Sequence, residues 1–277
     1  MPIAAVPAYL GNDFRGASPG LRFGMYLRLW GINRRTRALL WKTYDLDYEV
    51  RGQQRQEREI QIENKTDALS AAKTLSGSDK RTMQALGARQ RALAASASRE
   101  ALLCLEAKSV SPFTTGLGNE HPLENGFAFL WPYGLPYLPG SGVKGVVRRA
   151  AQELAHGMWE NSRGWSKLGD PCFTIEYRSG KEKRAVGLSV IDVLFGREPP
   201  PGDSDAVRGA LSFWDAIPQI EGDSLMVEIM TPHQSHYYQE RREPRSGNSS
   251  SPHDSGQPTP ICFLTVPPGS AFTFYVV

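Results

Sequence analysis

Cysteine is scarce in this sequence, and no two cysteines stand at the spacing of a metal or redox motif. The 277 residues include 3 cysteines, Cys104, Cys172 and Cys262, which lie far apart along the chain. An odd number without a C-x-x-C pair argues against a disulfide framework and against a cysteine-based zinc site. We therefore expect a reducing, cytoplasmic environment in which the three free thiols are buried, as free cysteines usually are.

Long hydrophobic runs are also missing. No stretch approaches the ~18 apolar residues of a membrane-spanning helix. The opening segment MPIAAVPAYLGNDFRG has neither the basic start nor the apolar run of a signal peptide. We expect no membrane partner.

A strong excess of one charge is absent too, because 32 basic and 29 acidic residues leave a net charge of +3. This mild balance permits an anionic partner without demanding one.

Helical and strand-like patterns are both present, and they do not alternate regularly. This mixture favours an α+β domain with a mostly antiparallel sheet over a doubly wound one. The expectations for the first hundred residues are an extended arm over 1–30, a short basic helix over 33–43, a solvated segment over 51–68, and a helix over 79–97 that buries Met83, Leu86, Leu93 and Ala97.

The rest of the chain reads as strands around one clear helix. We expect strands over 101–113, 172–178, 185–194, 210–215, 223–230, 261–266 and 271–277, with short extended pieces joined by turns over 126–140. The polar segment 241–260 is expected to be a flexible loop. Because the chain ends in the strand AFTFYVV, the fold is expected to lack its final element.

Gly140, Gly142 and Gly145 fit the dinucleotide-binding pattern G-x-G-x-x-G within PYGLPYLPGSGVKGVVRR. That motif needs a regular strand leading into the first glycine and an acidic residue about twenty positions later, at the end of a second strand. Prolines interrupt the preceding stretch, and Glu160 does not follow a strand pattern. The residues beside Lys144 also fail the P-loop pattern. We therefore expect no cofactor.

A simpler anion site at a helix N-terminus is still consistent with the sequence, although the dinucleotide and P-loop patterns do not fit. The pattern predicts a helix over 142–156, capped by Ser141 or Gly142, with glycine-rich backbone at its N-terminus. Lys144 and Arg148 lie one turn apart on one face, with Arg149 at its edge. A cation in the first turn opposes the helix dipole unless an anion is bound there. The alternative is that these are solvated side chains beside a tight turn.

Two other groups of residues have competing interpretations. The period of two in Phe127, Phe129 and Trp131 favours the core face of a strand over a base-stacking surface. His233 and His236 are three positions apart, but further metal ligands do not stand out, so no metal is expected. His121 is either a turn residue or a general base for metal-free RNA cleavage. Asp215 is expected to cap a turn.

The segment GLGNEHPLENGFAFLWPYGLPYLPGSGVKGVVRRA resembles the hallmark of the RAMP superfamily, the repeat-associated proteins of CRISPR systems. MPIAAVPAYLGNDFRG, LSFWDAIP, VEIMTPHQSHYY and PHDSGQPTPICFLTVPPGSAFTF resemble one branch, the sixth-subunit family of the Cmr complex, which is the type III-B CRISPR effector. The superfamily's central loop and helix appear here as Gly134, Pro136, Tyr137, Pro139, Gly140, Ser141, Lys144, Gly145 and Arg148.

The resemblance implies a ferredoxin-like, RRM-related core over 98–277, preceded by an N-terminal arm and helical extension over 1–97. It implies a non-catalytic backbone subunit that holds CRISPR RNA toward its 3′ end and faces target RNA, beside other Cmr subunits. The alternative in the same superfamily is a metal-independent RNA endonuclease that uses His121 or His233. The expected RNA-binding residues are Gly140, Ser141, Gly142, Lys144, Gly145, Arg148 and Arg149, with His121, Asn119 and Tyr137 as further candidates. Members of the superfamily commonly have a second glycine-rich loop near the C-terminus, and we find no such loop in this sequence. Either the sequence is truncated, or a partner is expected to cover the sheet edge that the terminal strand leaves unpaired.

Overall fold

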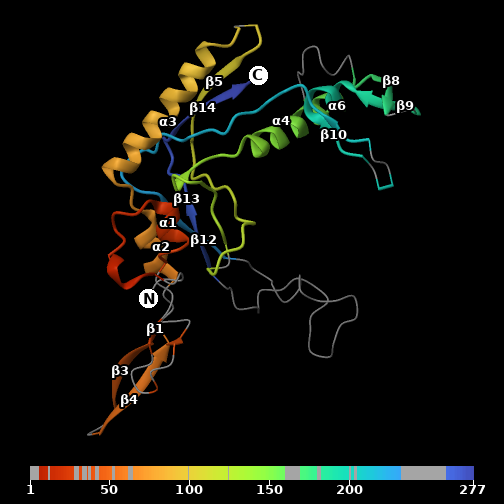
Figure 1. Ribbon diagram of the computed structural model, residues 1–277. Helices are drawn as coiled ribbons and strands as arrows, with labels where there is room; N and C mark the ends of the chain where they lie inside the picture. Colours follow the sequence, from red (N-terminus) through yellow and green to blue (C-terminus); the bar gives the residue numbers. More distant parts are fainter. Residues whose placement is uncertain are drawn as a thin grey trace, which may run out of the picture. The chain divides into compact units, whose positions relative to one another are not determined.

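The computed structural model is a mixture of helices and small antiparallel ladders, which confirms the expected α+β class (Figure 1). The structure describes residues 6–11, 13–27, 31–32, 36, 39–40, 44–51, 54–61, 65–98, 100–123, 125–159, 169–179, 182–199, 201–202, 205–231 and 260–277. Across these ranges, no helix combines the length and the apolarity that crossing a bilayer requires.

The chain folds into two compact units. Unit 1 consists of Met1–Leu86, Lys108–Tyr137 and Pro218–Ala271, and unit 2 consists of Gly87–Ala107, Leu138–Ile217 and Phe272–Val277. Unit 1 contains η1 (Ala8–Leu10), α1 (Pro19–Phe23), β1 (Gly31–Ile32), β2 (Leu39–Leu40), β3 (Tyr44–Arg51), β4 (Gln54–Gln61), α2 (Lys65–Lys73), β6 (Phe129–Leu130), β7 (Leu135–Pro136), β12 (Met226–Met230) and β13 (Ile261–Thr265). Helix α3 (Gly77–Ala95) begins in unit 1 and ends in unit 2.

A buried arginine fixes the N-terminal segment of unit 1. The guanidinium of Arg22, on α1, donates to the backbone oxygens of Ala17 at 2.8 Å, Ala71 at 2.5 Å and Thr74. Ala71 and Thr74 lie at the C-terminal end of α2, where helix carbonyls have no partner within the helix. A cation is favoured at that end of a helix. The side chain is only 8% exposed, so these bonds compensate for burying its charge.

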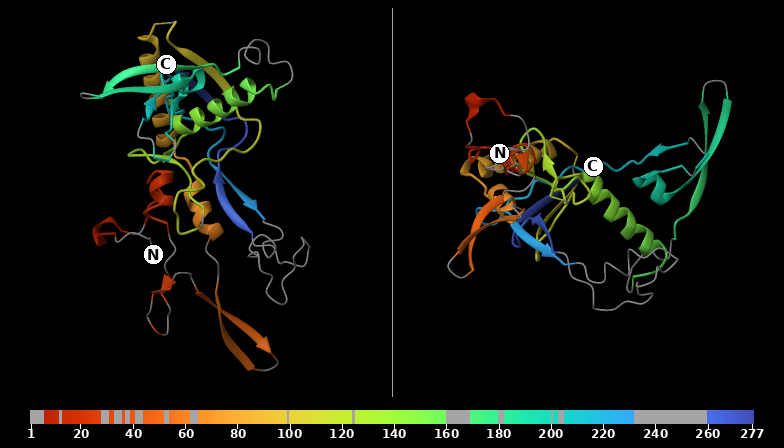
Figure 2. Two further views of the ribbon diagram at one scale, coloured as in Figure 1. Left: turned by 90° about the vertical axis from the view of Figure 1, so that its right-hand side faces the viewer. Right: turned by 90° about the horizontal axis from the view of Figure 1, so that it is seen from below.

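Unit 2 is built around the contact of two helices. It contains α4 (Gly140–Ala155), β8 (Cys172–Ser179), β9 (Glu182–Ser189), α6 (Val190–Phe195), β10 (Gly196–Arg197), β11 (Val207–Arg208) and all but one end residue of β5 (Leu103–Lys108) and of β14 (Ala271–Val276). Ala151 of α4 is buried against Ile191 and Phe195 of α6, and both helices lie side by side in Figure 1. The β8–β9 hairpin, which leads into α6, is the long teal ribbon in both views of Figure 2.

Several strand and helix expectations are confirmed. Helix α3 matches the pattern over 79–97, and α4 matches the pattern over 142–156. Strands β5, β8, β12, β13 and β14 lie where the sequence predicted them. Pro132 and Gly134 lie in the turn between the short strands β6 and β7, as the interrupted pattern predicted.

Other expectations for the N-terminal half are wrong. The arm over 1–30 includes the helix α1, which begins with Pro19 at its first position, a placement that proline favours. The helix expected over 33–43 is contradicted at Leu39 and Leu40, which pair as strand β2 with β1. The polar segment 51–68 was expected to be solvated, and that expectation stays a prediction; residues 54–61 within it form strand β4 of a hairpin with β3.

The buried stripe of α3 is shifted from the expected one. Met83 and Ala94 are buried, whereas Leu93 is 61% exposed. The half-buried Gln90 occupies the position between them and donates from Nε2 to the backbone oxygen of Asp215 at 2.6 Å. A pattern of apolar residues alone could not select a glutamine for this stripe.

Two further corrections concern unit 2 and the cysteines. The strand expected over 185–194 ends at Ser189, where α6 begins with a capping box formed by Ser189 and Asp192. The segment 210–215 makes a single bridge, between Phe213 and Val276, in place of a strand. The cysteines are free as expected, but Cys104 and Cys172 are exposed and Cys262 is half-buried. The expectation of buried thiols is therefore wrong.

Candidate functional site

The glycine-rich stretch enters α4 through a turn that the neighbouring chain holds in place. Leu138 exchanges two backbone hydrogen bonds with Ala216, both at 2.9 Å, and Pro139 is the N-cap residue of α4. Gly140 packs so closely that a Cβ there would lie 2.1 Å from the carbonyl oxygen of Phe213. The expected cap at Ser141 or Gly142 is wrong, because the N-cap residue is Pro139, two to three positions earlier.

Asp215 supplies the negative charge at this helix N-terminus. Its Oδ1 accepts a hydrogen bond from the backbone N–H of Gly140 at 2.7 Å. Asp215 was expected to cap a turn; it caps the N-terminus of α4 instead, where the positive end of the helix dipole favours a carboxylate. The N–H groups of Gly142 and Val143 donate to the oxygen of Pro139. In the described part of the chain, only the Ser141 N–H of this first turn lacks an acceptor.

The other two glycines of the pattern lie on open helix surface. A Cβ added at Gly145 would have no described protein atom within 4 Å, and one at Gly142 would meet only Leu138 Cδ1, at 3.9 Å. Val146 and Arg149 continue the same face, and Val146 is 72% exposed. A glycine inside a helix costs about 0.5–1 kcal/mol relative to alanine. Packing against the described residues therefore does not explain Gly145.

The basic residues of α4 divide between two faces. Arg148 shares a face with the buried Ala151, and its Nη2 lies 3.6 Å from Oδ1 of Asp192 on α6. Its Nε is buried, and no described residue accepts a hydrogen bond from it. Lys144 lies one turn earlier and is half-buried. Arg149 lies on the open face, with 69% of its side chain exposed, and donates to Glu153 at 2.8 Å. Arg148 thus joins α4 to α6, whereas Arg149 faces outward.

His121 belongs to unit 1, where both of its ring nitrogens are engaged. Nδ1 accepts from the N–H of Leu123 at 3.1 Å, so Nε2 carries the proton and donates to the oxygen of Phe23 at 2.9 Å. The ring stacks on Phe23 at a centroid distance of 3.8 Å. Burial lowers the pKa of His121, although the hydrogen bond to Phe23 opposes this. The imidazole is a neutral structural group with no nitrogen available to act as a base.

Asn119 and Tyr137 also belong to unit 1, whereas the glycines and cations of α4 belong to unit 2. Asn119 is exposed and closes a turn through its N–H, which donates to Gly116 at 3.0 Å. Tyr137 is half-buried directly after β7. The predicted site residues therefore form two groups, one on α4 and one in the loops of unit 1.

The aromatic residues separate by burial. Phe127 is buried and Phe129 is half-buried, which supports their assignment to the core. Trp131 and Tyr133 lie in the turn between β6 and β7 and are exposed.

Some of the predicted features lie outside the described residues, namely His233, His236, Glu160 and the loop residues 241–259. Within the described ranges, His, Cys, Asp and Glu form no cluster of three or more that could hold a metal.

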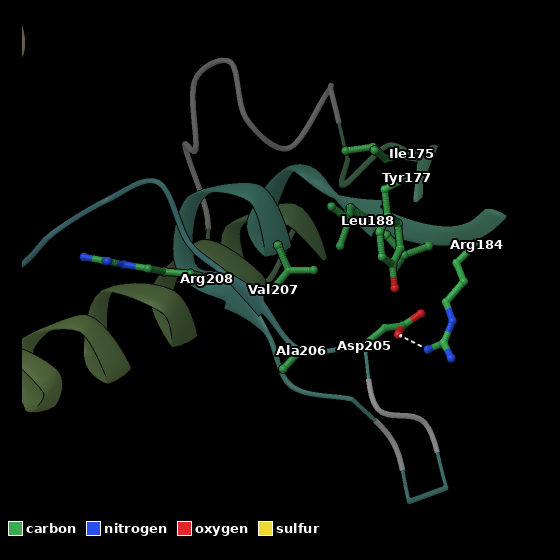
Figure 3. A pocket seen from close by; sticks show the side chains of 9 residues that line it. Ile175, Tyr177, Arg184, Leu188, Asp205, Ala206, Val207 and Arg208 are labelled. Carbon is green, nitrogen blue, oxygen red and sulfur yellow. Dashed lines mark hydrogen bonds and ion pairs between the residues drawn. The ribbon is translucent and has the colours of Figure 1, made fainter. Parts of the chain in front are cut away.

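A cavity of about 540 Å³ beneath the β8–β9 hairpin was not predicted from the sequence (Figure 3). Ile175, Val186 and Leu188 form its apolar wall. At its polar end Arg184 lies 3.4 Å from Asp205, and a hydrogen bond to Asp205 raises the pKa of Tyr177. Arg184 and Tyr177 both interact with Asp205, and these contacts hold the β8–β9 hairpin against the segment before β11. The ion pair joins residues 21 positions apart in the sequence, which no local pattern could predict.

A family model for the RAMP superfamily matches residues 106–277, which include α4 and its glycine-rich turn. The chain belongs to the RAMP superfamily. This confirms the resemblance on which the site expectations rested. The matched segment also contains Asn119, His121 and Tyr137.

This RAMP protein is similar to several proteins of CRISPR systems. It is 31% identical over 183 residues to the CRISPR system Cmr subunit Cmr6 of Pyrococcus furiosus, covering 58% of this chain and 53% of that relative. The chain thus spans about half the length of that relative. A subunit of the type III-B Cmr-beta complex bound to cognate target RNA is 17% identical, with a TM-score of 0.44, over 76% of this chain and 58% of that one. The crystal structure of Cmr6 from Pyrococcus furiosus gives 26% identity and a TM-score of 0.28, over 65% and 84%.

Proposed function

We propose that this RAMP protein is a non-catalytic, RNA-binding backbone subunit of a type III-B CRISPR ribonucleoprotein. It holds CRISPR RNA toward the 3′ end of the guide and faces target RNA, beside other Cmr subunits in the cytoplasm. The similarity to Cmr6 supports this assignment. The observation that carries it is the open glycine face of α4, where Gly142 and Gly145 leave helix backbone uncovered beside the outward-facing Arg149.

An open glycine face suits a phosphate backbone for steric and electrostatic reasons. Without a Cβ at Gly145, a sugar–phosphate chain can approach the helix backbone more closely than any side chain would allow. Arg149 offers a charge beside the same surface, and Lys144 offers one near the helix N-terminus. Contacts of this kind do not distinguish bases, so binding is expected to be insensitive to guide sequence and sensitive to salt.

The proposal divides the expected residues by role. The direct contacts to RNA phosphates come from α4, at Ser141, Gly142, Lys144, Gly145 and Arg149. Gly140 shapes the turn, and Arg148 keeps α4 seated on α6 through Asp192. Asn119 and Tyr137 are further contacts, whereas His121 holds its loop through Phe23 and Leu123. We extend the proposal to the fold: residues 98–277 form a ferredoxin-like RAMP core, and residues 1–97 form an N-terminal extension.

The sharpest test of the site is Gly145→Ala. This change should stabilise the fold by about 0.5–1 kcal/mol, because alanine is the better helix former and its Cβ enters open space. It should nevertheless weaken guide RNA binding by about tenfold, which corresponds to ~1.4 kcal/mol. Chemical denaturation and filter binding would measure the two effects.

A matched control is Gly77→Ala at the start of α3, where a Cβ would make only an ordinary contact with Arg81, at 3.5 Å. It should leave RNA affinity unchanged. Equal affinities of wild type and Gly145→Ala would contradict the open glycine face as the phosphate site. Specific cleavage of repeat RNA by the purified chain, lost in His121→Ala, would instead favour the endonuclease.

A further inference from the structure

A small hollow lies at the C-terminal end of α4, on the face that also carries Gly145. Arg149, Glu153 and His156 follow Gly145 on this face at helical spacing. Together with Gln152, Met158 and Asp170 they line a cavity of about 320 Å³. This volume is at the lower end of the range of small-ligand sites, about 300–1,000 Å³.

The chain returns toward this hollow through a well-defined turn. Gly157 has φ +69° and donates to the oxygen of Leu154 at 3.0 Å, while Met158 donates to the oxygen of Glu153 at 3.0 Å. This pair of bonds is the Schellman arrangement that commonly ends helices at a glycine. It brings Trp159 back beside the last turns of α4, so the position of the indole follows from the backbone.

A carboxylate then fixes the indole next to a guanidinium. Trp159 Nε1 donates to Oε2 of Glu153 at 3.0 Å, and Arg149 Nε donates to Oε1 of the same group at 2.8 Å. These bonds lower the pKa of Glu153. Trp159 is 49% exposed and Met158 is 67% exposed, so a large apolar surface is held open to solvent.

We propose that Trp159, Arg149 and the adjoining hollow form a site for one unpaired RNA nucleotide. The base stacks on the Trp159 indole, and its phosphate lies at Arg149. The inference rests on the proposed function, because this site extends the phosphate-binding face of α4. A fixed, exposed aromatic ring beside a cation is the arrangement by which proteins hold single-stranded bases. His156 donates from Nδ1 to the oxygen of Gln152 at 2.6 Å, which leaves Nε2 to accept from a base edge.

The test is Trp159→Ala, with binding of a fluorescein-labelled oligouridine measured by anisotropy. We expect the affinity to fall by about five- to a hundredfold, the usual effect of removing one stacking aromatic. Trp159→Phe should restore most of it, because phenylalanine also stacks. Trp131→Ala, which removes an exposed tryptophan from unit 1, is the control and should bind like wild type.

A position-specific readout separates stacking from a general loss of structure. In oligouridines carrying a single 2-aminopurine, wild-type protein should change the probe's fluorescence at one position, and Trp159→Ala should abolish that change. Wild-type affinity of Trp159→Ala, alongside weak binding by Gly145→Ala, would overturn this site and leave the proposed function standing. Wild-type binding by both variants would overturn both. Unchanged RNA affinity combined with loss of co-purifying partner proteins would show that Trp159 serves a protein contact instead.

Discussion

At the scale of single residues, His121 is the clearest example of a candidate catalyst with a structural role. It makes hydrogen bonds to Phe23 and Leu123 and stacks on the Phe23 ring. We predict that His121→Ala lowers the free energy of unfolding by about 2–3 kcal/mol, from two hydrogen bonds and one stacking contact. Urea denaturation would measure it. His156→Ala, which removes one hydrogen bond at an exposed position, should lower stability by less, about 0.5–1 kcal/mol.

The same histidine should make stability depend on pH. Burial lowers the pKa of His121 in the folded state, whereas in the unfolded chain it titrates near its usual ~6.5. Below about pH 6.5 the unfolded state therefore binds a proton that the folded state does not, and stability falls as the pH falls toward the folded pKa. Urea midpoints near about pH 7.5 and 5.5 should show this loss in wild type and less of it in His121→Gln. An identical pH dependence in both proteins would contradict it.

Asp215 offers a second residue-scale prediction. Asp215→Ala removes the acceptor of the Gly140 N–H and the negative charge at the N-terminus of α4. We expect a loss of about 1 kcal/mol in the free energy of unfolding, the usual contribution of a capping side chain. Asp215→Asn keeps an acceptor and should lose less. Thermal unfolding followed by circular dichroism would rank the three proteins, and an Asn variant as unstable as the Ala variant would show that charge, not capping, dominates.

At the scale of elements, the β8–β9 hairpin depends on side chains at its polar end. Arg184 and Tyr177 both bond to Asp205, which lies in the segment before β11. Asp205→Ala should release the hairpin locally and leave global unfolding nearly unchanged. Hydrogen exchange should quicken at Val186 and its neighbours in β9. Glu176→Ala, on the other face of β8, is the control and should leave these exchange rates as they are.

The elements also show which features a sequence pattern can predict. Helix α4 was predictable because proline and glycine precede a run of apolar residues at helical spacing. The start of α6 has a sequence signal too, because Ser189 and Asp192 have the spacing of a capping box, but the apolar run around them favoured a strand. Strand β4 was missed because its sequence, QRQEREIQ, lacks apolar alternation. The different roles of Arg148 and Arg149 could not be predicted, because only the fold shows which of the two arginines faces Asp192 on α6.

At the scale of the whole molecule, RNA binding should show the salt dependence of a few phosphate contacts. Replacing Lys144 and Arg149 together by alanine should lower the slope of log affinity against log salt by about 1.4, because each single-strand phosphate contact contributes ~0.7. Arg178 and Lys183, opposite each other on the exposed β8–β9 hairpin, provide a control with the same change in net charge. An equal effect of both double variants would mean that net charge alone governs binding.

The exposed thiol of Cys172 and the half-buried thiol of Cys262 have a practical consequence for spectroscopy. Cys172 belongs to unit 2 and Cys262 to unit 1, and neither is tied up in a disulfide. With Cys104 replaced by serine, a donor and an acceptor dye on these two native positions would report the separation of the units by energy transfer. Titrating RNA into such a labelled protein would turn guide loading into an optical signal, without introducing a new residue near the glycine face of α4.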